Sequence, residues 1–233
     1  MSVGVGFIGL GRMGRGMAGC ISRHSSPLLH VFDQSFAATT TFAERMGESV
    51  RAASSVEGVF NNSGVVFACL PTSQITKAVI LEALPNIKPN TVFVDCTSGD
   101  PVVTSEVGKI FEEGVKGGKF IDLPVSGGVK GAREGTLTAM AGGCPSVLGE
   151  VVRPIAEGFA KKIVHVGDKH GSGCAVKAVN NSLNMLNLLS ASEGLIALKR
   201  FGVEPEHALS SINGSSGRSL QTTVRIPEEI LTR

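Results

Sequence analysis

The sequence predicts an α/β fold: a doubly wound, mostly parallel Rossmann-type domain followed by an all-helical second domain. Short segments rich in Val, Ile and Phe recur along the first part of the chain without polar alternation, as in strands that are buried on both faces. Longer segments of helical character separate them, which is typical of parallel strands joined by crossover helices. After them the composition changes to one long helical pattern.

Seven segments of the first domain, which we place at residues 1–166, are predicted as strands. They are residues 4–9, 28–32, 65–70, 91–95, 119–122, 137–141 and 162–166. Helices are expected after the first strand, through Ile21, and over residues 36–46.

The second domain is expected at residues 167–233. One helix over residues 171–201 is predicted, with Gly202 as its C-cap, because apolar residues recur there at three- and four-residue spacing. A shorter helix over residues 205–212 and a turn rich in Gly and Ser follow. The tail around residues 226–230 has no convincing closing element, so we expect the domain to be incomplete in this chain.

The composition excludes several classes of protein. Hydrophobic residues make up 42% of the 233 residues and charged residues 18%, which indicates a packed core rather than disorder. A net charge of +2 without a block of like charges argues against nucleic acid or an anionic membrane as a partner. No apolar segment approaches the roughly 20 residues of a membrane span, and no targeting segment is visible. We therefore expect a soluble intracellular protein of the mitochondrial matrix or the cytoplasm.

The residue types also limit the chemistry. The five Cys are scattered singly and the five His lack ligand spacing, so neither disulfides nor a metal site is expected. The chain contains no Tyr and no Trp. A dehydrogenase mechanism that relies on a Tyr–Lys pair is therefore excluded.

A glycine-rich segment follows the first predicted strand and opens the first predicted helix. It reads Gly9, Leu10, Gly11, Arg12, Met13 and Gly14. In this context the G-x-G-x-x-G spacing is the fingerprint of dinucleotide binding, whose glycines allow a tight turn and a close approach of the pyrophosphate. The free N–H groups at the start of the helix would bind the phosphates.

Asp33 ends the second predicted strand, where an acidic residue binds the ribose hydroxyls and repels a 2′-phosphate. We therefore expect NAD as the cofactor rather than NADP. Two alternatives stay open: Asp33 instead caps the next helix, or Arg12 assists a phosphate.

The ends of two later strands are candidates to contact the cofactor, because ligands of open α/β sheets bind at the carboxyl ends of the strands. These candidates are Leu70, Pro71, Thr97 and Ser98. Ordinary turns contain the same residue types, which is the alternative.

The segment from Asp122 to Ala132 runs from a predicted strand into Ser126, Gly127 and Gly128. Small residues with exposed N–H groups form an anion-binding nest, which suits a substrate carboxylate. A flexible loop is the alternative.

Lys177 lies in the first half of the long predicted helix, followed by Asn180, Asn181 and Asn184. Positions 177, 181 and 184 share one helix face, so a polar stripe would line a site. Oxidation of an alcohol requires removal of the hydroxyl proton, and a Lys in a dry cleft has a lowered pKa that lets it take this proton. An ordinary exposed Lys is the alternative.

Together these segments resemble the β-hydroxyacid dehydrogenase family, and within it the dehydrogenases of 3-hydroxyisobutyrate most closely. Gly6 to Gly14 looks like the family's cofactor signature, Asp122 to Thr138 like its substrate signature, and Gly171 to Asn181 like its catalytic signature. Ser215 to Ser219 resembles a later turn of the family. The likeness covers essentially the whole chain.

The resemblance implies roles for residues in these segments. Lys177 takes the catalytic position. The substrate positions fall on Ser126, Gly127, Gly128 and Asn181, and the cofactor positions on Leu70, Pro71 and either Ser98 or Thr97. The implied reaction is the NAD-dependent oxidation of a small 3-hydroxy acid, first of all of 3-hydroxyisobutyrate to methylmalonate semialdehyde.

Departures from the family pattern leave alternatives open. Leu123 and Leu220 differ from the family's usual residues and would reshape the substrate pocket, so a reductase of tartronate, glyoxylic or succinic semialdehyde is the alternative enzyme. The family continues with further helices that form dimers or tetramers and carry a second functional Lys. A homo-oligomer is therefore expected if those helices are present, and a non-catalytic NAD(P)-binding relative is the second class of function.

Overall fold

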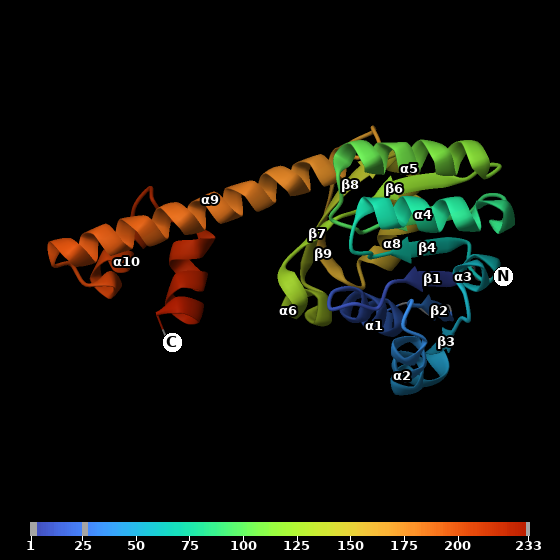
Figure 1. Ribbon diagram of the computed structural model, residues 1–233, viewed down its shortest axis with the longest axis horizontal. Coiled ribbons are helices and arrows are strands. Elements are labelled where there is room, and N and C mark those ends of the chain that lie inside the picture. Colours follow the sequence, from blue (N-terminus) through green and yellow to red (C-terminus); the bar gives the residue numbers. More distant parts are fainter. Residues whose placement is uncertain (1–3, 25–27, 232–233) are drawn as a thin grey trace. The chain divides into compact units, whose positions relative to one another are not determined.

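Figure 1 shows the computed structural model of the chain, which describes residues 4–24 and 28–231. The chain divides into two compact units, residues 1–177 and residues 178–233. This division falls inside the long helix α9 (Ser172–Phe201), whereas the sequence analysis placed a boundary after residue 166. An α/β part followed by a helical part confirms the predicted fold class.

One sheet, with nine strands among the described residues, forms the centre of the first unit. Its order is β3-β2-β1-β4-β5-β6-β8-β7, and β9 pairs with β8. The strands from β3 to β6 are parallel, whereas β8 is antiparallel to β6 and β7 and parallel to β9. The strands are β1 (Val5–Ile8), β2 (Leu29–Phe32), β3 (Val50–Ala52), β4 (Val65–Ala68), β5 (Val92–Asp95), β6 (Lys119–Asp122), β7 (Val125–Ser126), β8 (Leu137–Gly143) and β9 (Ala160–Gly167).

All seven predicted strands are present, with small shifts of their ends. The sequence analysis did not predict β3 and β7. Both are too short for an apolar pattern: β3 has three residues, of which only Val50 is buried, and β7 has two.

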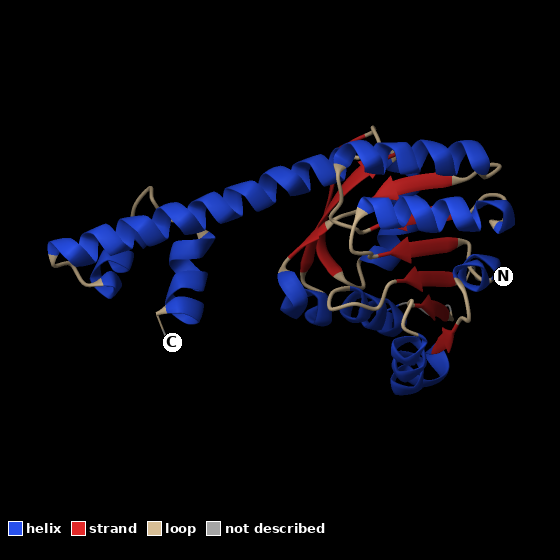
Figure 2. Cartoon of the chain, viewed as in Figure 1, coloured by secondary structure: helices blue, strands red, loops and turns tan. Residues whose placement is uncertain are grey.

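The helices of the first unit are α1 (Gly14–His24), α2 (Phe36–Met46), α3 (Val56–Asn61), α4 (Ser73–Ala83), α5 (Pro101–Gly114), α6 (Gly128–Glu134), α7 (Pro145–Val147) and α8 (Arg153–Ala156). Single turns of 3-10 or π helix are η1 (Gly47–Ser49), η2 (Leu84–Asn86) and η3 (Leu148–Val152). Helices lie on both sides of the sheet (Figure 2). Alternate residues of a strand therefore pack in two separate hydrophobic cores, one on each face of the sheet. In β4, Phe67 packs in a core with α1, α6 and α8, and Val66 packs in a core with α3, α4 and α5.

Polar side chains fix where four of these helices begin. Ser35, Ser55, Thr72 and Asp100 each accept a hydrogen bond from an amide in the first turn of α2, α3, α4 and α5, respectively. These bonds satisfy amides that have no partner within the helix.

The second unit contains the rest of α9, α10 (Pro205–Asn213) and the π-helical η4 (Gln221–Ile230). A small core of Leu195, Ala208, Leu209 and Ile226 joins them. The sequence analysis predicted no element for the tail, yet η4 forms there with Pro227 inside it, because Ile226 is buried in this core. None of the helices in the described part of the chain is both long and apolar enough to cross a membrane.

Helix α1 packs closely against α6. A Cβ at Gly16 would lie 2.9 Å from the carbonyl carbon of Ala132, and the Cys20 thiol donates a hydrogen bond of 3.3 Å to the Ala132 carbonyl. This contact ties α6, which begins at Gly128 of the predicted substrate segment, to the helix that follows the glycine-rich segment.

We predict that Gly16→Ala lowers the free energy of unfolding by about 1–3 kcal/mol, because the α6 backbone must move to admit the methyl group. Gly19→Ala on the same helix is the matched control. Its Cβ would meet only the ends of two flexible side chains, at 3.4 and 4.0 Å. The control should therefore raise the free energy of unfolding by about 0.5–1 kcal/mol through helix propensity. Urea denaturation measures both, and equal effects would contradict the close contact.

Candidate active site

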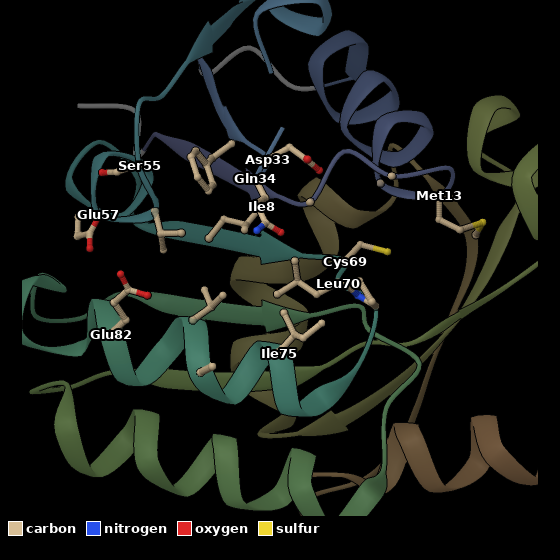
Figure 3. Close-up of a pocket in the computed structure, with 18 of the residues that line it drawn as sticks. Ile8, Met13, Asp33, Gln34, Ser55, Glu57, Cys69, Leu70, Ile75 and Glu82 are labelled. Carbon is tan, nitrogen blue, oxygen red and sulfur yellow. The ribbon is translucent and has the colours of Figure 1, made fainter. Parts of the chain in front are cut away.

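A cavity of about 840 Å³ lies at the carboxyl ends of the parallel strands, beside β1 and β4. At this point the strand order reverses, which is where open α/β sheets bind ligands. Its lining residues lie at or just after the ends of β1, β2, β3 and β4, at the starts of α1 and α3, or on α4. In Figure 3, Glu57 and Glu82 lie at one end of the cavity and Met13 at the other.

The glycine-rich segment forms one wall of this cavity. Of its six residues, only Leu10 does not line it, because the Leu10 side chain is buried in the core beneath. Gly9 has a φ of +95°, and a Cβ there would meet the Cys69 carbonyl oxygen at 2.4 Å. A Cβ at Gly14 would overlap the Gly9 carbonyl oxygen. Both positions therefore require glycine.

Gly11 lines the cavity but has open space in front of it. No atom lies within 4 Å of the position that a Cβ would occupy at Gly11. A ligand can therefore approach this backbone closely, as a pyrophosphate does at the start of a Rossmann helix. The residues present fit a dinucleotide.

Asp33 also lines the cavity and is bound to the glycine-rich segment. Its carboxylate accepts hydrogen bonds from the Leu10 amide at 2.7 Å and from the Ser35 amide at 2.9 Å. Ser35, rather than Asp33, caps α2. The structure therefore does not support the alternative in which Asp33 is only a helix cap.

Of the candidates at the ends of β4 and β5, only those after β4 line the cavity. Leu70 and Pro71 line the cavity. Thr97 is buried instead, and its hydroxyl accepts a hydrogen bond of 3.0 Å from the Leu70 amide, so it holds the Leu70 turn in place. Ser98 is exposed and is not among the lining residues.

The sequence analysis did not select several other lining residues. Ser54 and Ser55 lie in the loop after β3, and Glu57 lies in the first turn of α3. Ile75, Val79 and Glu82 lie on α4. The unpredicted strand β3 would have been the signal, because its carboxyl end leads into this loop. Without β3 the sequence does not place Ser54, Ser55 and Glu57 beside Asp33.

Two buried carboxyl groups lie at the ends of the neighbouring strands β5 and β6, where Asp95 is in register with Asp122. Asp95 accepts a hydrogen bond from the Thr97 amide at 3.0 Å through Oδ1, while its buried Oδ2 has no partner in the described structure. Burial raises the pKa of Asp95 to about 7, opposed by the hydrogen bonds from Thr97. Burial also raises the pKa of Asp122, although backbone amides bind its carboxylate and oppose the shift.

Helix α9 begins at this same edge of the sheet. Asp122 accepts hydrogen bonds from the Gly171 amide at 2.8 Å and from the Cys174 amide at 2.9 Å. One turn later, Lys177 is only 9% exposed, and within the described residues its ammonium group has no ion pair or hydrogen bond. Loss of hydration on burial lowers the pKa of Lys177.

The predicted substrate segment lies on the far side of β8, at the end of β7. Ser126 is half-buried at the end of β7 and pairs with Thr138 of β8, while Gly127 and Gly128 are exposed and have positive φ values of +134° and +67°. Exposed backbone of this kind, at the start of α6, can present its N–H groups to an anion.

The polar stripe predicted on α9 is divided between the two units. Lys177 closes the first unit, and Asn181 is an exposed residue of the second. Asn184 accepts a hydrogen bond from the buried amide of Gln221 on η4, so it serves the packing of the second unit.

Two family profiles match consecutive parts of the chain. The profile described as the NAD binding domain of 6-phosphogluconate dehydrogenase matches residues 4–167. The profile described as NAD-binding of NADP-dependent 3-hydroxyisobutyrate dehydrogenase matches residues 171–233.

Known proteins are similar to nearly the whole chain. The 2-(hydroxymethyl)glutarate dehydrogenase of Eubacterium barkeri is 36% identical over 99% of this chain and 75% of its own length. The mitochondrial 3-hydroxyisobutyrate dehydrogenase of Drosophila melanogaster is 34% identical over 96% of this chain and 67% of its own. The structure of Mycobacterium tuberculosis 3-hydroxyisobutyrate dehydrogenase with L-serine matches with a TM-score of 0.89 and 29% identity, over 97% of this chain and 75% of that one. The chain thus spans part of the length of each relative.

We predict a pH-dependent gain in stability for Asp95→Asn. In the folded protein the Asp95 carboxyl group keeps its proton up to about pH 7, whereas its ordinary pKa is 3.8. The wild type therefore loses free energy of unfolding as the pH rises from about 4 to about 7, and the uncharged amide does not.

Urea denaturation from pH 5 to pH 8 measures the difference between variant and wild type, which should grow with pH. Asp122 is present in both proteins, and its charge is a smaller cause of the raised pKa of Asp95 than burial is. Glu113→Gln, at an exposed carboxyl group of α5, is the control and should show no such growth. A difference that stays constant with pH would show that Asp95 titrates normally.

Proposed function

The chain belongs to the β-hydroxyacid dehydrogenase family of nicotinamide-dependent oxidoreductases, and we propose that it oxidises a small 3-hydroxy acid with NAD. The proposed substrate is 3-hydroxyisobutyrate, and the product is methylmalonate semialdehyde. The observation that carries this proposal is the burial of the Lys177 amine, with no ion pair to it in the described part of the chain, at the edge of the sheet that also bears the cavity.

Lys177 is proposed to take the proton of the substrate hydroxyl at Nζ. Because its pKa is lowered, a larger fraction of Lys177 is neutral at a given pH. The neutral amine is the form that accepts a proton. NAD, when bound, supplies the acceptor for the two electrons that leave the alcohol carbon. In the reverse direction Lys177 returns the proton, so the same residues would also serve the reduction of a related semialdehyde.

Ser126, Gly127 and Gly128 are proposed to bind the substrate carboxylate. The hydroxyl of Ser126 and the exposed backbone of the two glycines offer donors without a fixed positive charge. Asn181 is proposed for the same purpose by resemblance to the family. The charge of the substrate would thus be held apart from Lys177.

The proposed preference for NAD rests on the charges that line the cavity. Asp33, Glu57 and Glu82 contribute three carboxylates, and Arg12 contributes one guanidinium group. A 2′-phosphate would add negative charge to this setting, which is unfavourable at close range. The ribose hydroxyls of NAD can instead donate hydrogen bonds to Asp33.

Lys177→Met should lower kcat by a factor of about 10²–10⁴, because it removes the proton acceptor but keeps most of the apolar stem. The affinity for NAD should stay unchanged, since Lys177 does not line the cavity. Absorbance of NADH over a panel of 3-hydroxy acids measures turnover, and fluorescence titration measures NAD binding. Lys109→Met, at an exposed site on α5, is the control. A folded Lys177→Met protein with the wild-type rate would refute the assignment, and a wild type that binds NAD but turns over no acid would refute the enzyme.

Asp33→Asn should reduce the preference for NAD over NADP by about tenfold, or about 1.4 kcal/mol. The amide keeps an acceptor for the Leu10 amide but removes the charge that repels a 2′-phosphate. The ratio of kcat/KM values for the two cofactors is the measurement. An unchanged ratio would show that Asp33 does not set the choice of cofactor.

A further inference from the structure

The N-terminus of α9 lacks a capping side chain of its own. The Gly171 carbonyl accepts the first helical hydrogen bond, from the Ala175 amide at 2.9 Å, so Gly171 occupies the cap position. It has a φ of +88°, and a Cβ there would meet the Pro101 carbonyl oxygen at 2.3 Å. Glycine is therefore required at this position, and a polar cap residue is excluded.

Asp122 supplies the missing cap from β6. Its carboxylate binds the amides of Gly171 and Cys174, which lie 49 and 52 residues away in the sequence. A capping side chain normally accepts from the third amide of its own helix, and Cys174 holds that position here. The carboxylate is completely buried.

Two further glycines make this contact close. A Cβ at Gly142 of β8 would meet Asp122 Oδ1 at 2.3 Å, and a Cβ at Gly173 would meet the Met140 carbonyl oxygen at 2.2 Å. From the other side, the Thr104 hydroxyl of α5 donates to the Cys174 sulfur at 3.6 Å. The first turn of α9 is therefore held from β6, β8 and α5 at once.

The same residue also borders the proposed substrate segment. Asp122 is the last residue of β6, and the chain reaches Ser126 four residues later. In α9, Lys177 follows Cys174 by three residues, close to one helical turn. A single side chain thus links the strand that leads to the proposed carboxylate site with the turn that precedes the proposed proton acceptor.

We propose that Asp122 is a positioning residue that fixes the distance between the carboxylate-binding segment and Nζ of Lys177. This inference rests on the proposed function of Lys177. A 3-hydroxy acid has its carboxylate and its hydroxyl at a set separation, and displacement of a reacting group by about 1 Å costs about 100-fold in rate. Asp122 acts only through the position of α9, and it does not itself take up or release a proton in the reaction.

The test is Asp122→Asn, which keeps the size of the side chain but turns one acceptor toward an amide into a donor. We expect kcat to fall by about 100-fold, while the dissociation constant for NAD stays unchanged. The solvent deuterium isotope effect on kcat should rise, because a misplaced amine makes proton transfer slower than the other steps. Loss of folded protein alone would lower the rate without changing this isotope effect.

Glu112→Gln is the matched control. Glu112 also binds a backbone amide of β6, that of Phe120 at 3.1 Å, and pairs with His170 just before α9, but it does not bind the amides of α9. It should keep kcat and the isotope effect near those of the wild type. If Asp122→Asn does not fold, Asp122→Glu replaces it: the longer acid keeps the charge and both acceptors but displaces the turn, so the same changes are expected.

A folded Asp122 variant with wild-type kcat overturns the inference about Asp122. The proposed function is unaffected by that result as long as Lys177→Met is inactive. An equal loss in Glu112→Gln with an unchanged isotope effect also overturns the inference, because the loss is then a general effect of disturbing this region. If Lys177→Met keeps the wild-type rate, the proposed function fails and the inference fails with it.

Discussion

The hydrogen bonds from the start of α9 to the Asp122 carboxylate constrain the rest of the candidate site. They require a helix terminus to lie against the ends of β6 and β8, and this leaves room only for glycine at positions 142 and 173. Pro101 of α5 leaves room only for glycine at position 171. Bonds to a charged group contribute about 1.5–3 kcal/mol each, which is comparable with the several kcal/mol that burial of a carboxylate costs. The interaction therefore adds little net stability, but it allows only one position for the turn that precedes Lys177.

Asp95 and Asp122 show how surroundings give the same side chain different properties. They are partners in neighbouring strands, yet backbone amides bind both oxygens of Asp122, whereas Oδ2 of Asp95 has no partner among the described residues. The amides at the helix terminus oppose the rise in the pKa of Asp122 that burial causes. Hydrogen bonds from Thr97 oppose the effect of burial on Asp95 only in part, and the pKa of Asp95 rises to about 7. Its bond to the Thr97 amide, and the bond from the Leu70 amide to the Thr97 hydroxyl, connect this buried group to the wall of the cavity.

The fold class and the longer strands could be predicted from the sequence, because strands buried on both faces form uninterrupted apolar segments. The glycine-rich segment and Asp33 could be placed together because their spacing reflects one strand-turn-helix unit. The role of Asp122 could not, since it depends on a contact across 49 residues that no local pattern records. Glu57 was missed for a different reason: β3, the strand that leads to it, is too short to leave a signal. Asn184 was assigned to the polar stripe from its spacing alone, whereas its partner Gln221 lies on an element that the sequence did not predict.

The central claim is that burial, with no ion pair to the amine among the described residues, keeps more of Lys177 in the neutral, proton-accepting form than an exposed lysine. An NMR titration of the lysine side chains tests it most directly, with the Lys177 signal identified by its absence in the Lys177→Met spectrum. The account predicts that Lys177 titrates below the ordinary lysine pKa of 10.5, because burial removes hydration from its charged form. A Lys177 signal that titrates with those of the exposed lysines would contradict the account.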